Sequence, residues 1–232
     1  MIASQMINVL FVFGLAGMLM GSVHAIMEKD TRRMIAYSSV AQIGYIYMGI
    51  GLGTQAGMVA AVFHMFTHSA TKALLFISAV GLYEVSGDRK DYRSLVGAGY
   101  RNPLAGIGFA VGALSMVGFP MLSGFISKLL FATSALQSPH KMLPTIIALA
   151  VSTVLNAVYF LRLVITLYTI PSGEENEGES TSALPEKQKP EGIKESREKQ
   201  IVLKRQRFSK FRLAVVSYIL LNLVLGLYSQ PI

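Results

Sequence analysis

The chain has 232 residues, of which 52% are hydrophobic and only 15% are charged, and its mean hydropathy is +0.49. Since a soluble domain carries about 25% charged residues, this composition argues against a soluble enzyme. The formal net charge of +8 comes from clusters between long uncharged runs, and no basic stretch is interleaved with aromatic residues, which argues against nucleic-acid binding. The absence of cysteine excludes disulfides, thiolate metal sites and a redox centre of the chain's own.

Uncharged apolar runs of about 18 residues or more indicate membrane-spanning helices. We predict spans at 5–26, 34–52, 56–83, 103–118, 142–170 and 213–228, with a short apolar stretch at 121–137. That stretch follows Gly118 and Pro120 and contains Gly124, so a continuous helix is weakened there. The predicted fold class is therefore all-α: a polytopic transmembrane helical bundle of six or seven spans with one broken helix.

The hydrophilic residues divide the chain into a transmembrane bundle over 1–170, a charged linker over 171–212 and a C-terminal transmembrane helix within 213–232. The basic loops 27–33 and 84–102 fall on one side of the membrane, as the positive-inside rule expects. If 121–137 crossed fully, the basic segment 187–212 would fall on the other side. Either that stretch does not cross simply, or the last segment departs from the rule. The basic segment itself fits a helix on anionic headgroups or a solvated loop.

Titratable residues inside the third span are the first candidate site. His64, His68 and Lys72 are spaced by four residues and therefore occupy one helix face, with Thr67 and Thr71 beside them. A lysine inside the bilayer costs about 2.5–3.5 kcal/mol on insertion scales and normally faces a partner or a hydrated cavity. Histidine titrates near neutral pH. This row is suited to passing protons along a bundle interior; the alternative is a set of structural polar groups.

Lys128 is the second candidate, because it follows a Gly/Pro-interrupted stretch. Breaks in a membrane helix survive only where they are buried or line a cavity. The alternative is an interfacial loop lysine. Arg162 and His24 fit interfacial or capping roles. We expect no metal site at His64 and His68, since no carboxylate lies on that face, and we expect no cofactor.

Three segments resemble a known family. Residues 29–45 resemble the "D-x-K-R-x-x-A-Y-S-S" segment of the antiporter-like membrane subunits of NADH–quinone oxidoreductase (complex I), Mrp-type cation/proton antiporters and membrane-bound hydrogenases. Residues 63–76 resemble that family's "F-H-x-x-x-H-A-x-x-K-x-x-L-F" helix, and residues 118–128 its "G-x-P-x-x-x-G-F-x-S-K" segment. Residues 88–95 resemble the loop between those helices.

The resemblance implies proton translocation through buried lysines, histidines and water. By position, His64, His68 and Lys72 would form the central relay and Lys128 would be the lysine of the broken helix, with Thr67, Thr71 and Ser127 as accessory groups. Arg32 stands where the family often has lysine, and because arginine stays charged it fits an electrostatic or structural role better than proton carriage.

The family's members usually have about fourteen spans, of which this chain resembles the second part. The glutamate and lysine of the first half-channel have no counterpart here. The resemblance implies a non-redox membrane subunit of a proton-translocating NADH–quinone oxidoreductase or related complex, in a bacterial or archaeal cell membrane. Its partners would be other membrane subunits, protons and the lipid bilayer; transport of Na⁺ and the choice of parent complex are left open. The alternative is a truncated or structural membrane subunit that does not conduct on its own.

Overall fold

A computed structural model describes residues 2–170 and 192–228, and the side chains within 5–170 and 209–228. The described residues are almost entirely helical, with one isolated β-bridge between Asp30 and Asp91. This confirms the predicted all-α class. The elements are α1 (Ile2–Met27), α2 (Thr31–Gly51), α3 (Gln55–Glu84), the 3₁₀ turn η1 (Arg93–Leu95), α4 (Ala98–Arg101), α5 (Pro103–Val117), α6 (Ser123–Ala135), α7 (Pro139–Tyr168) and α8 (Gly192–Tyr228).

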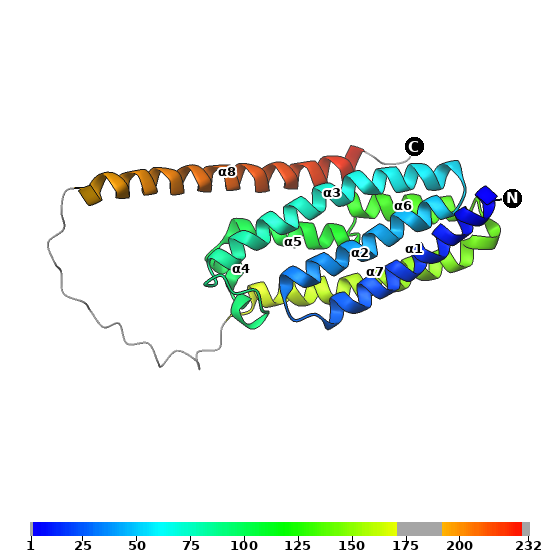
Figure 1. The fold of residues 1–232 in the computed structure, drawn as a ribbon, viewed down its shortest axis with the longest axis horizontal. Coiled ribbons are helices and arrows are strands. Elements are labelled where there is room, and N and C mark those ends of the chain that lie inside the picture. Colours follow the sequence, from blue (N-terminus) through cyan, green and yellow to red (C-terminus); the bar gives the residue numbers. More distant parts are fainter. Residues whose placement is uncertain (1, 171–191, 229–232) are drawn as a thin grey trace.

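Four segments of the described helices are long and apolar enough to cross a membrane: Gln5–Met27, Gln55–Glu84, Pro139–Tyr168 and Ser209–Tyr228. α2 lies between α1 and α3 (Figure 1). At its beginning the Thr31 amide donates to the Lys90 carbonyl, and at its end the Gly51 carbonyl accepts from Lys141 Nζ. α2 therefore joins both ends of the bundle.

α1 and α2 pack backbone against backbone. A Cβ on Gly21 of α1 would lie 2.5 Å from the Ala41 amide nitrogen, whereas one on Gly17 would lie 3.5 Å from the Gly44 Cα atom, an ordinary contact. Small residues of this kind allow membrane helices to approach closely.

α5 and α6 form one interrupted crossing. Along α5 and α6, Asn102 bonds to Gly81, Ser115 approaches Thr71 and Ser127 approaches His64. As the residue number rises along α5 and α6, the number of the α3 partner falls. Both helices therefore run in the same direction, antiparallel to α3. The predicted broken helix is confirmed, and the bundle has six crossing elements within the described ranges: α1, α2, α3, α5–α6, α7 and α8.

The break has a local cause. Gly118 has φ +92° and ends α5, and its amide donates to the carbonyls of Leu114 and Ser115. A left-handed glycine with such bonds is a common helix ending. Pro120 cannot donate to a helix, and Met121 has φ +73°, so α6 begins only at Ser123.

Most of the charged side chains that the structure describes gather at one end of the bundle, which we call the charged end: residues 28–33, the loop 84–102, Arg162, Lys210 and Arg212. The Thr31–Lys90 hydrogen bond of 2.9 Å and the Gly97–Thr166 bond of 3.3 Å tie its segments together. The two basic loops therefore lie on the same side, as predicted. Because α5–α6 is a single crossing, α7 also ends at the charged end.

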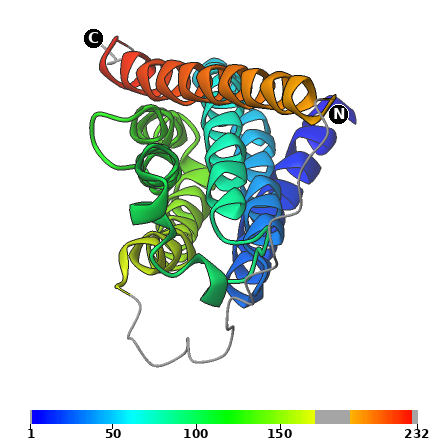
Figure 2. The same ribbon diagram turned by 90° about the vertical axis from the view of Figure 1, so that its left-hand side faces the viewer.

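α8 lies obliquely across one face of the bundle (Figures 1 and 2). Phe211 lies against Gly81, Val215 against Gly108 and Gly226 against Met121. The helix is continuous from Gly192, and its first half extends past the charged end (Figure 1). The predicted boundary at 213 thus falls inside a helix. Of the predicted linker, 171–191 lies outside the described residues, and 192–212 is helical.

Candidate functional site

The predicted row on α3 lies on one face of that helix. His64, Thr67, Thr71 and Lys72 are buried, and His68 is half-buried. The rings of His64 and His68 are stacked with centroids 6.0 Å apart. The i, i+4 spacing produces this arrangement, because each step advances one helical turn with little rotation.

Lys72 is 7% exposed. Its Nζ donates to the Ile35 carbonyl at 2.6 Å and to Ser38 Oγ at 2.5 Å, both on α2. Lys72 lies one helical turn beyond His68 on α3. Removing an ammonium group from water costs free energy. Without a carboxylate partner, the carbonyl and hydroxyl dipoles around Lys72 must offset that cost.

Lys128 is held by the helix break. Its Nζ donates to the Val117 carbonyl at 2.6 Å and to Thr153 Oγ1 on α7 at 3.0 Å. Val117 is the last residue of α5, so its carbonyl has no helical partner further along the chain. The lysine stem passes over Gly118, where a Cβ would lie 2.9 Å from Lys128 Cδ. The break therefore provides both the acceptor and the space for this side chain.

Ser127, the residue before Lys128 on α6, contacts His64 on α3 and so connects the two helices that carry the lysines. The Ser127 hydroxyl donates to the Gly124 carbonyl at 3.0 Å and lies 3.0 Å from His64 Nδ1. Since the hydroxyl proton is directed to Gly124, His64 Nδ1 is assigned as the donor in that pair, which leaves Nε2 as the acceptor in the neutral ring. His64 and Lys128 both line a small cavity. We call His64, His68, Lys72, Ser127 and Lys128 the lysine–histidine cluster.

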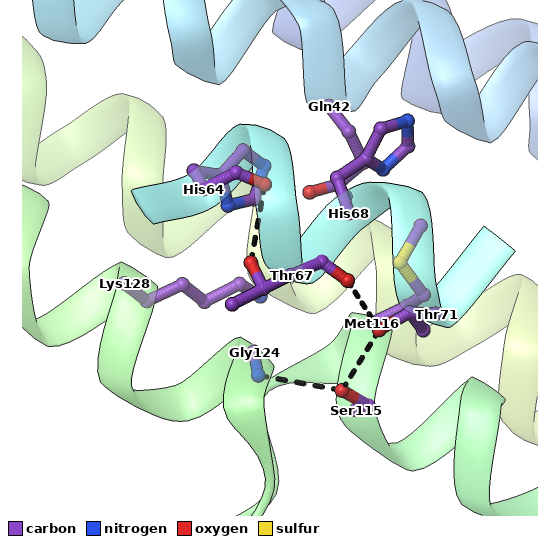
Figure 3. Close-up of a pocket in the computed structure, with 9 residues that line it drawn as sticks. All are labelled: Gln42, His64, Thr67, His68, Thr71, Ser115, Met116, Gly124 and Lys128. Atoms are coloured by element: carbon purple, nitrogen blue, oxygen red, sulfur yellow. Dashed lines mark hydrogen bonds between the residues drawn. The ribbon is translucent and has the colours of Figure 1, made fainter. Parts of the chain in front are cut away.

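The small cavity, of about 10 Å³, borders three members of this cluster, His64, His68 and Lys128 (Figure 3). It borders α2, α3, α5 and α6, and a volume of this size holds about one water molecule. Three of its nitrogens, Gln42 Nε2, His64 Nε2 and His68 Nδ1, make no hydrogen bond within the described protein. The lining residues are Gln42, His64, Thr67, His68, Thr71, Ser115, Met116, Gly124 and Lys128.

The predicted accessory residues divide into two groups. Thr67 and Thr71 lie beside the cluster. The Thr67 hydroxyl donates to the His64 carbonyl at 3.1 Å. The Thr71 hydroxyl lies 2.8 Å from the Thr67 carbonyl, and we assign its one proton to Asn222 Oδ1 on α8, at 2.7 Å. Arg32 is exposed at the charged end, away from the cluster. His24 is exposed on α1 and stacks on Tyr37, in keeping with the interfacial placement expected for it. Arg162 lies over the Tyr92 ring at 5.0 Å, also at the charged end.

Sequence reasoning missed several polar groups of the site. Gln42 and Ser38 on α2 approach the cluster, and Asn222 on α8 accepts hydrogen bonds from Thr71, Ser115 and Ser123. A single amide in the apolar run 213–228 was a visible sign of such a role, because an unpaired amide is costly in a membrane. The backbone acceptors of the lysines leave no such sign in the sequence.

Together these features define a polytopic helical membrane protein with an interrupted crossing and two lysines inside the bundle, of which Lys72 is buried and Lys128 half-buried. The chain belongs to the family described as NADH:quinone oxidoreductase/Mrp antiporter, whose model matches residues 1–156.

Relatives include proteins named as NADH–quinone oxidoreductase subunits and as antiporter subunits. "NADH-quinone oxidoreductase subunit N" of Desulforudis audaxviator is 37% identical over 165 residues, which is 71% of this chain and 32% of the relative. A probable K(+)/H(+) antiporter protein of Rhizobium meliloti is 34% identical over 131 residues, which is 55% of this chain and 13% of that protein.

A solved structure shares the fold. A chain of the Mrp complex from Dietzia sp. DQ12-45-1b superposes with a TM-score of 0.75 at 22% identity, covering 98% of this chain and 45% of that one. The chain thus spans about a third of the length of the complex I relative and less than half of the structural one.

Proposed function

We propose that this chain conducts protons along the lysine–histidine cluster, as one membrane component of a multi-subunit redox-driven pump or cation/proton antiporter. The observation that carries the proposal is a pair of lysines inside the bundle, Lys72 buried and Lys128 half-buried. Within the described residues, each is held by neutral acceptors. Two histidines and a serine lie between the lysines.

The geometry supports a stepwise transfer. A proton released by Lys72 can reach His68 on the next turn, and His64 Nε2 is the free acceptor beyond it. On the far side, the Nδ1 proton of His64 is directed at Ser127, beside Lys128. Water in the small cavity would complete the donor–acceptor chain. Because like charges repel in a low dielectric, protonation of one lysine disfavours protonation of the other, which couples the two sites.

The setting of the chain is part of the proposal. Other membrane subunits would supply the driving energy and the remaining half-channel, in a bacterial or archaeal cell membrane. The excess of Lys and Arg at the charged end predicts that this end faces the cytoplasm.

The test uses the assembled complex in everted membrane vesicles, with proton uptake followed by a quenched fluorescent amine. The variants are the double substitution Lys72→Ala, Lys128→Ala and the matched control Lys141→Ala, a lysine at the opposite end of the bundle that donates to Gly51. We expect the double variant to lose uptake and the control to keep it, at equal amounts of assembled complex. Wild-type uptake by the double variant would instead support a structural subunit that does not conduct.

A further inference from the structure

α8 carries one buried polar side chain among its described residues, Asn222, in an otherwise apolar stretch. Its Oδ1 accepts from Thr71 Oγ1 at 2.7 Å, from Ser123 Oγ at 2.9 Å and from Ser115 Oγ at 3.1 Å. Its Nδ2 donates to the Tyr218 carbonyl at 2.9 Å, one turn back. One amide oxygen therefore joins four helices, α3, α5, α6 and α8.

Two of these partners lie on either side of the helix break. Ser115 belongs to the last turn of α5, and Ser123 is the first residue of α6. The two hydroxyls are 3.2 Å apart, and Asn222 bridges them. One turn further along α8, Gly226 lies directly against the carbonyl of Met121, where a Cβ would not fit. The amide and the glycine thus fit α8 onto the interruption.

α6 begins without a cap of its own, since the side chain of its N-cap residue, Leu122, makes no capping hydrogen bond. Ser115 supplies one from the other half, because its oxygen accepts from the Gly124 amide at 3.3 Å. The Ser115 hydroxyl proton must then be directed elsewhere, and Asn222 Oδ1 accepts it. An exposed helix start in a membrane needs such partners, because no water replaces them in the hydrocarbon core.

The same contacts position the residues around Lys128 and the small cavity. Lys128 lies about one turn after Gly124, and the acceptor of its Nζ, the Val117 carbonyl, lies just before the break. Thr71 and Ser115 line the small cavity together with both histidines (Figure 3). A shift of one half of the broken helix against the other would therefore change the distance between Lys128 and its acceptor.

We infer that Asn222 is a positioning residue for proton transfer: it fixes the two halves of the broken helix and thereby holds Lys128 against the Val117 carbonyl. This inference rests on the proposed function, since it concerns the same lysine. It assigns α8 a part in the half-channel itself rather than in the wall of the bundle alone.

The test is Asn222→Leu in the assembled complex, with proton uptake by everted vesicles measured across a range of pH. We expect uptake to fall by about tenfold, because small misplacements of reacting groups cost this much or more. We also expect the pH profile to move to lower pH, because the Lys128 ammonium loses its carbonyl acceptor. Ser217→Ala, an exposed polar position on the same helix, is the matched control and should keep the wild-type rate and profile.

A second variant guards against failure of Asn222→Leu to assemble. The double substitution Ser115→Ala, Ser123→Ala leaves α8 unchanged and removes the two hydroxyls that bridge the break. It should move the pH profile in the same direction. An unchanged profile in both variants, at normal levels of complex, would overturn the inference. Loss of uptake in the Lys72, Lys128 double variant alongside such a result would leave the proposed function standing.

Discussion

The charged end and the lysine–histidine cluster differ in the partners of their charged side chains. At the charged end both signs occur, and the acids have structural work: Asp30 accepts from the Arg32 amide at 2.8 Å, and Asp91 accepts from Ser94 Oγ at 2.8 Å. In the cluster two lysines are held by carbonyls and hydroxyls. All the carboxylates among the described side chains lie at or beyond helix ends, at Glu28, Asp30, Glu84, Asp88 and Asp91.

From this difference we expect the charged end to contribute mainly to the stability of the fold and the cluster mainly to the proposed proton transport. A capped helix end or an ordered loop stabilises the fold, whereas a buried cation without a counter-ion costs free energy and is expected where its charge is used. Variants in the cluster should therefore impair transport more than stability, and variants at the charged end should do the reverse. The predictions below start with the largest expected effect.

Gly118→Val should have the largest effect, because it should lower both the stability of the fold and the rate of proton transport. The backbone at Gly118 has φ +92°, and a side chain there meets Lys128. A left-handed conformation costs an L-residue roughly 1–2 kcal/mol before any crowding. We expect a lower thermal midpoint in detergent and little proton uptake. Gly17→Ala, at a helical glycine with room for a methyl group, is the control; a similar loss there would point to a general intolerance of substitution.

Ser38→Ala and Thr153→Val test the two lysines separately. The Ser38 hydroxyl lies 2.5 Å from Lys72 Nζ, and the Thr153 hydroxyl 3.0 Å from Lys128 Nζ. Hydrogen bonds to charged groups contribute about 1.5–3 kcal/mol. We expect about a tenfold slower proton uptake for Ser38→Ala and a smaller loss for Thr153→Val, with near-normal thermal midpoints. The reverse order of effects would contradict the assigned contacts.

Asp30→Ala should act on stability alone. Asp30 caps α2 by accepting from the amides of Arg32 and Arg33, and removal of such a cap costs about 1 kcal/mol. The expected result is a lower thermal midpoint with transport per assembled complex unchanged. Asp30→Asn keeps the capping oxygen and should retain most of the stability. A transport defect in a stable Asp30→Ala protein would break the division between the two regions.

The smallest effect concerns pH at the loop 84–102. The hydroxyl of Ser94 holds the pKa of Asp91 below its ordinary value of 3.8. The stabilising contribution is therefore fully present above pH 3.8 and is lost as the pH falls through the lower folded-state pKa. The protection of the loop amides against hydrogen exchange, measured relative to the intrinsic exchange rate at each pH, should fall only in that acidic window. Ser94→Ala should move the onset of this loss of protection towards pH 3.8, and an unchanged onset would contradict the assignment.

The sequence predicted much of this arrangement for a physical reason. Helical periodicity is regular, so the row of His64, His68 and Lys72 could be placed on one face, and Gly118 and Pro120 indicated a break. Hydropathy does not show whether the chain continues in the same direction after a break or turns back. It therefore could not decide whether α5 and α6 form one crossing or two. The acceptors of Lys72 and Lys128 are largely backbone carbonyls, which every residue has. Asn222 is 151 residues away from its Thr71 partner along the chain, and only the packing of α8 brings them together.

The most direct test of the account is Lys72→Arg in the assembled complex. Arginine keeps the positive charge and can donate to Ile35 and Ser38, but it does not release a proton at any accessible pH. If Lys72 carries protons, the rate of proton uptake by everted vesicles should be as low for Lys72→Arg as for Lys72→Ala, with the complex fully assembled. Wild-type uptake by Lys72→Arg would show that only the charge is needed and would contradict the proposed relay.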